Sequence, residues 1–219
     1  MTAPSAHRGT LLVFVKSPVP GRVKTRLAGA IGSEAAALHY RLMGRTVVEM
    51  ARSGPWRTVV HFTPSGAEET IRRWLGSHGL DFRPQHEGDL GARMHHALVD
   101  TFRDPGSTGP ICLVGTDTPA LGVTRIEEAF HRLEEGVEVV LGPSLDGGYY
   151  LVGLREPRPE LFAEMRWSTP TVLDETLARA RRLGIVPHLL PPLNDIDRVE
   201  DLPVGLLGSG EPRAREEGG

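Results

Sequence analysis

The sequence predicts an α/β fold in which helices cover both faces of a mostly parallel sheet. Short apolar runs alternate along the chain with longer segments of helical periodicity, which is typical of successive βαβ units. The run "LLVFV" at residues 11–15 is apolar throughout, as expected for a strand buried on both faces. The chain has 219 residues, of which 39% are hydrophobic, so we expect one domain over residues 1–207. Residues 208–219 are Gly-rich and charged, and we expect them to form a disordered tail.

The expected strands are short apolar runs that end at turn-forming or polar residues. The first run, residues 11–15, stops at Lys16-Ser17-Pro18. In open parallel sheets, ligands bind just beyond the carboxyl ends of the strands, so the residues that follow each strand are the first candidates for a functional site. The other expected strands are residues 58–62, 111–115, 137–141, 149–154 and 186–190.

Capping residues and apolar periodicity predict the helices between these strands. Ser33 is expected to cap the first helix, residues 34–52. Thr124 and Thr169 are expected to cap two later helices, and Pro170 suits the first position of the second. The apolar positions of the first helix are Leu38, Leu42, Met43, Val47 and Met50. The other expected helices are residues 67–75, 89–102, 124–135 and 169–183, with a short one from residue 197.

Composition and motif content exclude several classes of protein. The net charge of −3 argues against a general nucleic-acid-binding protein. No apolar run approaches the roughly 20 residues of a membrane-spanning helix, and we expect no signal peptide. The single cysteine, Cys112, excludes an internal disulfide bond and fits a reducing, cytoplasmic location; its apolar surroundings predict a buried side chain. The spacings typical of zinc and serine hydrolases are missing, and the oligomeric state does not follow from the sequence.

A basic loop follows the first strand. The stretch "KSPVPGRVKTRL", residues 16–27, holds four cations, and no acidic residue precedes Glu34. Two prolines restrict the backbone, and Gly21 allows a turn or a close approach to a ligand. Arg and Lys suit the oxygens of a pyrophosphate, although the loop is neither a P-loop nor a dinucleotide fingerprint. The alternative is a solvated basic surface turn. The four cations are Lys16, Arg22, Lys24 and Arg26.

Four aspartates lie where a carboxylate could act on a phosphate or an acceptor. Asp117 follows the strand at residues 111–115 and could bind Mg²⁺, or form a turn or helix cap. Asp197 could also face a metal, although its spacing to Glu200 fits a capping box. Asp146 precedes two glycines and is our candidate general base, or simply part of a hairpin turn. Asp89 begins a predicted helix, where capping is the simplest role.

Several motifs, taken together, resemble a known family. They are "FVKSPVPGRVKTRL", "EGDLGARM", "VGTDTPAL", "LGPSLDGGYYLVGL", "WST" and "DIDRVEDL", and they span roughly residues 11–203. The sequence resembles a bacterial family of small glycosyltransferase-like proteins, formerly a domain of unknown function, with members assigned to arsenosugar biosynthesis. That family belongs to the nucleotide-diphospho-sugar transferase superfamily, so the resemblance implies the GT-A fold, a Rossmann-like three-layer sandwich. The chain departs from the family pattern where it reads "DIDRVEDL" and not "DIDTPEDL".

The resemblance also implies roles for individual residues. The loop would hold the phosphates of a nucleotide through Lys16, Gly21, Arg22, Lys24 and Arg26, with Lys24 as a catalytic cation. Two aspartates, Asp117 and Asp197, would bind Mg²⁺ or Mn²⁺. The sugar or acceptor would lie near Asp146, Gly147, Gly148, Trp167, Ser168 and Thr169, although Trp167 could instead belong to the core.

Three functions remain open at this point. The first is a metal-dependent glycosyltransferase that moves a sugar from a nucleoside-diphosphate sugar to a small acceptor. The second is a nucleotidyltransferase that couples a nucleoside triphosphate to a phosphorylated small molecule and releases pyrophosphate. The third is a non-catalytic module that binds nucleotide sugars. The released product, nucleoside diphosphate or pyrophosphate, separates the first two, and turnover with any donor separates both from the third.

Overall fold

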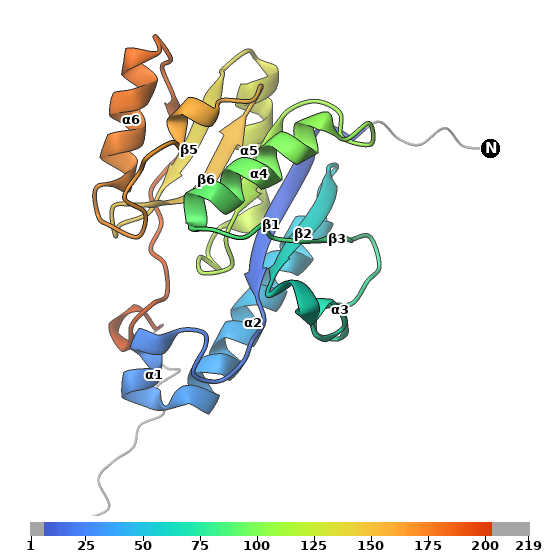
Figure 1. The fold of residues 1–219 in the computed structure, drawn as a ribbon, viewed down its shortest axis with the longest axis vertical. Helices are drawn as coiled ribbons and strands as arrows, with labels where there is room; N and C mark the ends of the chain where they lie inside the picture. The colour runs from blue at the N-terminus through green and yellow to red at the C-terminus, as the bar shows by residue number, and fades with distance from the viewer. Residues whose placement is uncertain (1–6, 203–219) are drawn as a thin grey trace, which may run out of the picture.

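A seven-stranded sheet forms the centre of the molecule. The computed structural model describes residues 7–202, so the predicted tail at 208–219 lies outside the described residues (Figure 1). The strand order is β3-β2-β1-β4-β6-β5-β7, and only β6 runs antiparallel to its neighbours within the described sheet. The strands are β1 (Thr10–Lys16), β2 (Arg57–Thr63), β3 (Asp81–Pro84), β4 (Ile111–Val114), β5 (Val139–Pro143), β6 (Tyr149–Leu154) and β7 (His188–Leu189).

Helices cover both faces of this sheet, which confirms the predicted class. Successive residues of β1 alternate between two cores: Leu11 and Val13 pack towards α2, α3 and α5, whereas Leu12 and Phe14 pack towards α4. Helix α6 lies over the same face as α4 (Figure 1). The helices are α1 (Thr25–Ile31), α2 (Ser33–Arg52), α3 (Glu68–Leu75), α4 (Leu90–Arg103), α5 (Gly122–Glu134) and α6 (Val172–Arg182), with 3₁₀ turns at Ser65–Ala67, Pro159–Leu161 and Val199–Asp201.

The predicted apolar face of α2 is partly wrong. Met43 and Val47 are buried, but Leu38 and Leu42 are 57% and 55% exposed. Small residues and Tyr40 occupy the buried stripe instead, because α2 packs closely on the sheet and on α3. The position of Gly44 shows how close this packing is: a Cβ there would lie 2.5 Å from the Trp74 ring. A count of large apolar residues therefore misplaces the buried face.

Three predicted helix caps are also wrong. Helix α2 starts at Ser33 itself, with Gly32 as its N-cap. Helix α5 starts at Gly122, before the predicted cap Thr124. Helix α6 starts at Val172 and not at Thr169, because the chain turns at Ser168, whose φ is +61°. Helix α1, the edge strand β3 and the 3₁₀ turn at Pro159–Leu161 have no counterpart among the predicted elements.

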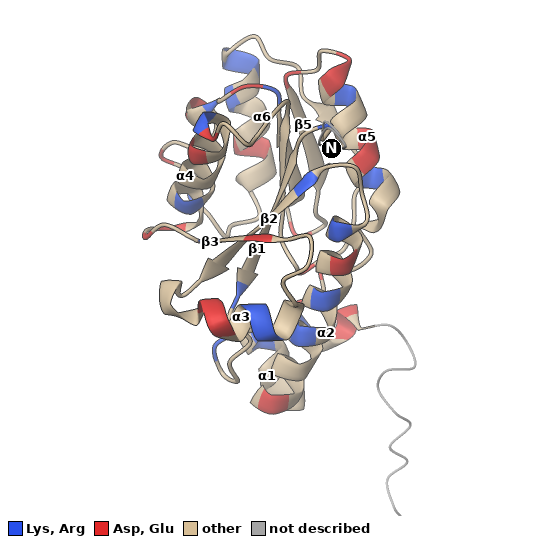
Figure 2. Ribbon diagram, turned by 90° about the vertical axis from the view of Figure 1, so that its right-hand side faces the viewer, with Lys and Arg blue, Asp and Glu red and all other residues tan. Residues whose placement is uncertain are grey.

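Charged residues of both signs are spread over the described helices. Figure 2 shows acidic and basic segments interspersed along α2, α4 and α5, so the basic loop is a local feature. Cys112 is buried, as predicted, and burial raises the pKa of its thiol. Among residues 7–202, no helix is long and apolar enough to cross a membrane.

The loops that follow β1 to β5 gather along one edge of the sheet, which we call the carboxyl edge. Segment 190–197 returns to the same edge. The backbone N–H of Leu193 donates to the Pro143 carbonyl at 3.0 Å, and that of Ile196 donates to the Asp117 carbonyl at 2.9 Å. The C-terminal motif therefore lies beside the ends of β4 and β5.

Candidate functional site

Lys24 joins the basic loop to the aspartate that follows β4. Its Nζ lies 2.8 Å from Asp117 Oδ1 and donates to the Ile196 carbonyl at 2.5 Å. The side chain is only 4% exposed, and the backbone is left-handed with φ +46°. A non-glycine residue is held in that conformation only where its surroundings fix it, and here both contacts fix the amino group. The structure thus brings three distant segments of the chain to one point.

The other cations of the loop are exposed. Lys16, at the end of β1, and Arg22 both face solvent, and Gly21 turns the backbone with φ +74°. Arg26 forms an ion pair with Asp197 at 2.7 Å. The loop therefore presents three reachable cations at the carboxyl edge, whereas Lys24 lies beneath them with its amino group already paired.

The alternative role for Asp197, a capping box with Glu200, does not form. The carboxylate of Asp201, not that of Glu200, caps the last 3₁₀ turn by accepting from the backbone N–H groups of Asp197 at 3.0 Å and Arg198 at 2.8 Å. The Asp197 side chain is left to pair with Arg26.

Asp195 is a functional candidate that the sequence prediction left out. The Thr118 hydroxyl donates to Asp195 Oδ1. Burial raises the pKa of the Asp195 carboxyl, and the nearby Asp117 and Asp146 raise it further. Ser144 is only 5% exposed, and its hydroxyl lies beside Asp195. The only sequence signal was the spacing "DID", which cannot say which aspartate faces inward.

Tyr40 ties the ends of β1 and β4 together beneath the site. Its buried hydroxyl accepts from the Lys16 backbone N–H at 2.8 Å and from Thr116 Oγ1 at 3.2 Å. Burial raises the pKa of Tyr40 to about 12, so the phenol stays neutral. This link fixes the spacing between the basic loop and the Asp117 loop.

Asp146, Gly147 and Gly148 form the turn between the antiparallel strands β5 and β6. Asp146 is exposed, and its Oδ1 accepts from the Gly148 N–H at 3.0 Å, so the turn interpretation is correct as local structure. Gly147 has φ +90°, and a Cβ there would lie 2.0 Å from the Pro170 carbonyl oxygen. The turn therefore packs tightly on the segment that carries Trp167, Ser168 and Thr169.

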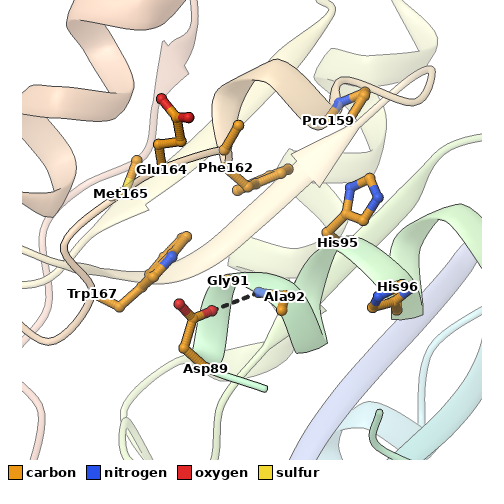
Figure 3. A pocket seen from close by; sticks show the side chains of 11 residues that line it. Asp89, Gly91, Ala92, His95, His96, Pro159, Phe162, Glu164, Met165 and Trp167 are labelled. Carbon is orange, nitrogen blue, oxygen red and sulfur yellow. Dashed lines mark hydrogen bonds between the residues drawn. The ribbon is translucent and has the colours of Figure 1, made fainter. Parts of the chain in front are cut away.

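Trp167 lies on the first turn of α4, over a position that only glycine can fill. A Cβ at Gly91 would lie 1.9 Å from Trp167 Nε1. Asp89 caps α4 by accepting from the Ala92 N–H at 2.8 Å, which is the simplest role that the sequence predicts for it. Figure 3 shows Trp167 and Asp89 beside a cavity between α4 and residues 159–167.

The carboxylates at this edge suit a metal ion only when a ligand completes its coordination. Within residues 7–202, no three His, Cys, Asp or Glu side chains are arranged to hold a metal ion by themselves. Asp117 is close enough to Asp195 to help raise the pKa of the Asp195 carboxyl, and the Ser144 hydroxyl lies beside Asp195. Mg²⁺ commonly takes one or two carboxylates and completes its shell with phosphate oxygens and water. These residues fit such an ion.

Several solved structures share the fold of this chain. A provisionally assigned nucleotide-diphospho-sugar transferase from Desulfovibrio desulfuricans G20 is 31% identical, with a TM-score of 0.82 over 88% of this chain and 84% of its own. Two more distant structures share the fold alone. Rv0371c of Mycobacterium tuberculosis H37Rv, in complex with manganese, has 16% identity and a TM-score of 0.54 over 88% and 95% of the two chains. CMP:2-keto-3-deoxy-manno-octonic acid synthetase, in complex with CTP, has 10% identity and a TM-score of 0.53 over 86% and 92%.

The family comparison agrees with the resemblance drawn from the motifs. No curated protein matches the chain. The model of one protein family matches residues 46–169, which is more than half of the chain and includes the "EGDLGARM", "VGTDTPAL" and "LDGGYY" motifs. The chain belongs to that family, described as "Uncharacterized protein conserved in bacteria (DUF2064)".

Proposed function

We propose that this protein is a glycosyltransferase that moves a sugar from a nucleoside-diphosphate sugar to a small acceptor in the presence of Mg²⁺ or Mn²⁺. The family and the fold support a nucleotide-using transferase. The observation that carries the proposal is the 2.8 Å contact between Lys24 and Asp117, because it joins the cations after β1 to the carboxylate after β4. A diphosphate is the ligand that uses both groups at once.

The reaction places negative charge where the loop is positive. The acceptor oxygen forms a bond to the anomeric carbon of the sugar, and the bond from that carbon to the diphosphate oxygen breaks. The diphosphate leaves with the bonding electron pair. Lys16, Arg22 and Arg26 would contact its oxygens, and Gly21 would let the backbone approach them. Lys24 would not contact the diphosphate itself; it would fix the orientation of the Asp117 carboxylate through their ion pair.

The acceptor proton needs a base at the same edge. Asp146 is the candidate, since its Oδ1 is engaged by Gly148 while no described residue donates to its other oxygen. Gly147, Gly148, Trp167, Ser168 and Thr169 would form the acceptor side, because the turn at Gly147 packs against Pro170.

Asp117 would hold the metal ion, together with Asp197 as the sequence predicts or Asp195 as the packing favours. The ion would act as a Lewis acid and neutralise negative charge on the leaving diphosphate. Arg26 already pairs with Asp197, whereas Asp195 is half-buried and close enough to Asp117 for that carboxylate to raise its pKa.

Product analysis tests the proposal. The protein would be incubated with a panel of nucleoside-diphosphate sugars and Mn²⁺, and release of nucleoside diphosphate measured with and without chelator. We expect slow, metal-dependent release of nucleoside diphosphate as the sugar is transferred to water or to an added alcohol. The Asp117→Asn variant should release none. Pyrophosphate release from a nucleoside triphosphate and a sugar phosphate would replace the proposal with nucleotidyl transfer. Binding of donors without any turnover would indicate the non-catalytic module.

A further inference from the structure

A cavity of about 330 Å³ lies between the first turns of α4 and residues 159–167. Figure 3 shows the rings of Phe162 and Trp167 and the side chain of Met165 on one side, with His95 across from them on α4. Its volume and largely apolar walls are those of a site for a small organic molecule.

This cavity adjoins the acceptor side of the proposed reaction. Trp167 lies on the first turn of α4 at one end of the cavity, three residues before Pro170. Pro170 contacts Gly147 in the turn that also carries Asp146, and Asp146 influences the charge of Asp195 beside Asp117. The Trp167 segment, the β5–β6 turn and the Asp117 loop are therefore neighbouring segments between the cavity and the Lys24–Asp117 pair.

The charges that line the cavity are opposite to those of the basic loop. Two carboxylates line it, Asp89 and Glu164, and they flank the Phe162 and Trp167 rings (Figure 3). The other polar side chains of the lining are the imidazoles of His95 and His96, and no Lys or Arg is among the described lining residues. Arg179 does not line the cavity; its guanidinium donates to the backbone carbonyls of Ala163 and Glu164 at the Glu164 end. The cavity therefore disfavours an anion and favours a cation.

The indole of Trp167 stacks on Phe162 and lies in the cavity wall, and its N–H has no protein partner among the described residues. The other two tryptophans donate to backbone carbonyls, Trp56 to Ala51 at 2.6 Å and Trp74 to Arg41 at 3.2 Å. Trp167 donates to no residue within 7–202. Trp is the aromatic side chain that attracts organic cations most strongly, and two neighbouring carboxylates add to that attraction.

We propose that this cavity binds the sugar acceptor, and that the acceptor is a hydroxyl-bearing organic cation, an amine or quaternary ammonium beside an apolar body. The role of acceptor rests on the proposed function, whereas the preference for a cation rests on the cavity alone. The cation would lie among Trp167, Asp89 and Glu164, with the apolar body against Phe162 and Met165.

Two probes of matched size and opposite charge test the preference. Tyramine and 4-hydroxyphenylacetate share a phenol ring and differ in carrying an ammonium or a carboxylate. Calorimetry on the full chain would give both dissociation constants, and choline would serve as a quaternary ammonium probe. We expect tyramine to bind at least about tenfold more tightly than 4-hydroxyphenylacetate. Tyramine should quench tryptophan fluorescence in the wild type but not in Trp167→Phe.

Charge variants identify the residues responsible. The double variant Asp89→Asn/Glu164→Gln should bring the two dissociation constants within about threefold of each other, roughly 0.7 kcal/mol. Asn caps a helix about as well as Asp, so α4 should stay intact. The control Glu160→Gln removes a nearby charge outside the cavity and should leave the preference unchanged. Equal binding of the two probes by the wild type, a preference that survives the double variant, or no binding of tyramine or choline would each overturn the inference.

The same protein would be titrated with a nucleoside diphosphate and Mn²⁺. Nucleotide binding without tyramine or choline binding refutes the cation site and leaves the proposed function standing. Tyramine binding at Trp167 without any nucleotide binding refutes the proposed function and leaves the cation site standing.

Discussion

The buried amino group of Lys24 gives the site its shape. It is the one loop cation among the described residues that contacts Asp117, and it also contacts the Ile196 carbonyl. Lys24→Met keeps the length of the side chain and removes its charge, so Asp117 would lose its orientation. We expect nucleoside diphosphate to bind about 10- to 100-fold more weakly, the range for a lost hydrogen bond to a charged group. Calorimetry measures this change.

A control variant distinguishes the effect of the Lys24–Asp117 contact on nucleotide binding from the effect of the net charge of the protein. Arg73→Met removes one positive charge from the exposed face of α3, where Arg73 pairs only with Glu69. It should leave the nucleotide affinity unchanged. Equal weakening by the two substitutions would mean that net charge, and not the Lys24–Asp117 contact, governs binding.

Asp195 and Asp197 can be distinguished by matched amide variants. We expect Asp195→Asn to reduce Mn²⁺-dependent nucleotide binding more than Asp197→Asn, because Arg26 already pairs with Asp197, whereas Asp195 lies near the Asp117 carboxylate. Electron paramagnetic resonance of free Mn²⁺ measures the bound fraction directly. The opposite order would restore Asp197 as the second metal-side carboxylate.

The β5–β6 turn is the element that connects the two halves of the proposed site. Gly147→Ala would place a methyl group against the Pro170 carbonyl at a residue with φ +90°. We expect a loss of about 2–3 kcal/mol in unfolding free energy, which lowers the melting temperature by roughly 5–10 °C in a chain of this size. Thermal denaturation followed by circular dichroism measures it.

A second glycine provides the matched control. Gly29 lies in helix α1, where an added Cβ would have no neighbour within 4 Å and the backbone φ is not positive. Gly29→Ala should leave the melting temperature unchanged or raise it, since Ala favours helix over Gly by about 1 kcal/mol. If Gly147→Ala were as stable as this control, the turn would not pack on the Trp167 segment as described.

At the scale of elements, the sequence predicts strands better than it predicts helix ends. Residues 11–15 and 111–115 are apolar because both faces of the sheet are covered, and this signal is local. Strand β3 reads "DFRP" and carries no such signal, since backbone pairing with β2 alone defines it. The start of α6 depends on how the chain packs at Gly147, a contact between distant segments. The choice between Asp195 and Asp197 depends on tertiary packing in the same way.

The whole molecule carries a pH dependence that is separate from the site. His61 in β2 is buried against Phe14, and neither ring nitrogen has a partner among residues 7–202. Burial lowers the pKa of His61 from 6.5 to about 4, and Arg83 contributes. In the unfolded chain His61 is therefore protonated below pH 6.5, whereas in the folded chain it is protonated only below about pH 4. The contribution of neutral His61 to the unfolding free energy is therefore present above pH 6.5 and is lost as the pH falls to about 4.

His61→Phe tests this dependence. Between neutral pH and about pH 4, we expect the wild type to lose about 3 kcal/mol more unfolding free energy than the variant, by urea denaturation. An identical pH dependence in both proteins would mean that His61 is protonated or solvated in the fold.

The central claim is that the basic loop and Asp117 bind one diphosphate together. The most direct measurement is calorimetric titration of a nucleoside diphosphate into the wild type and Asp117→Asn, each with and without Mn²⁺. We predict that Mn²⁺ strengthens binding to the wild type by tenfold or more, about 1.4 kcal/mol, and has no effect on binding to the variant. Equal affinity and equal metal dependence in the two proteins would contradict the claim.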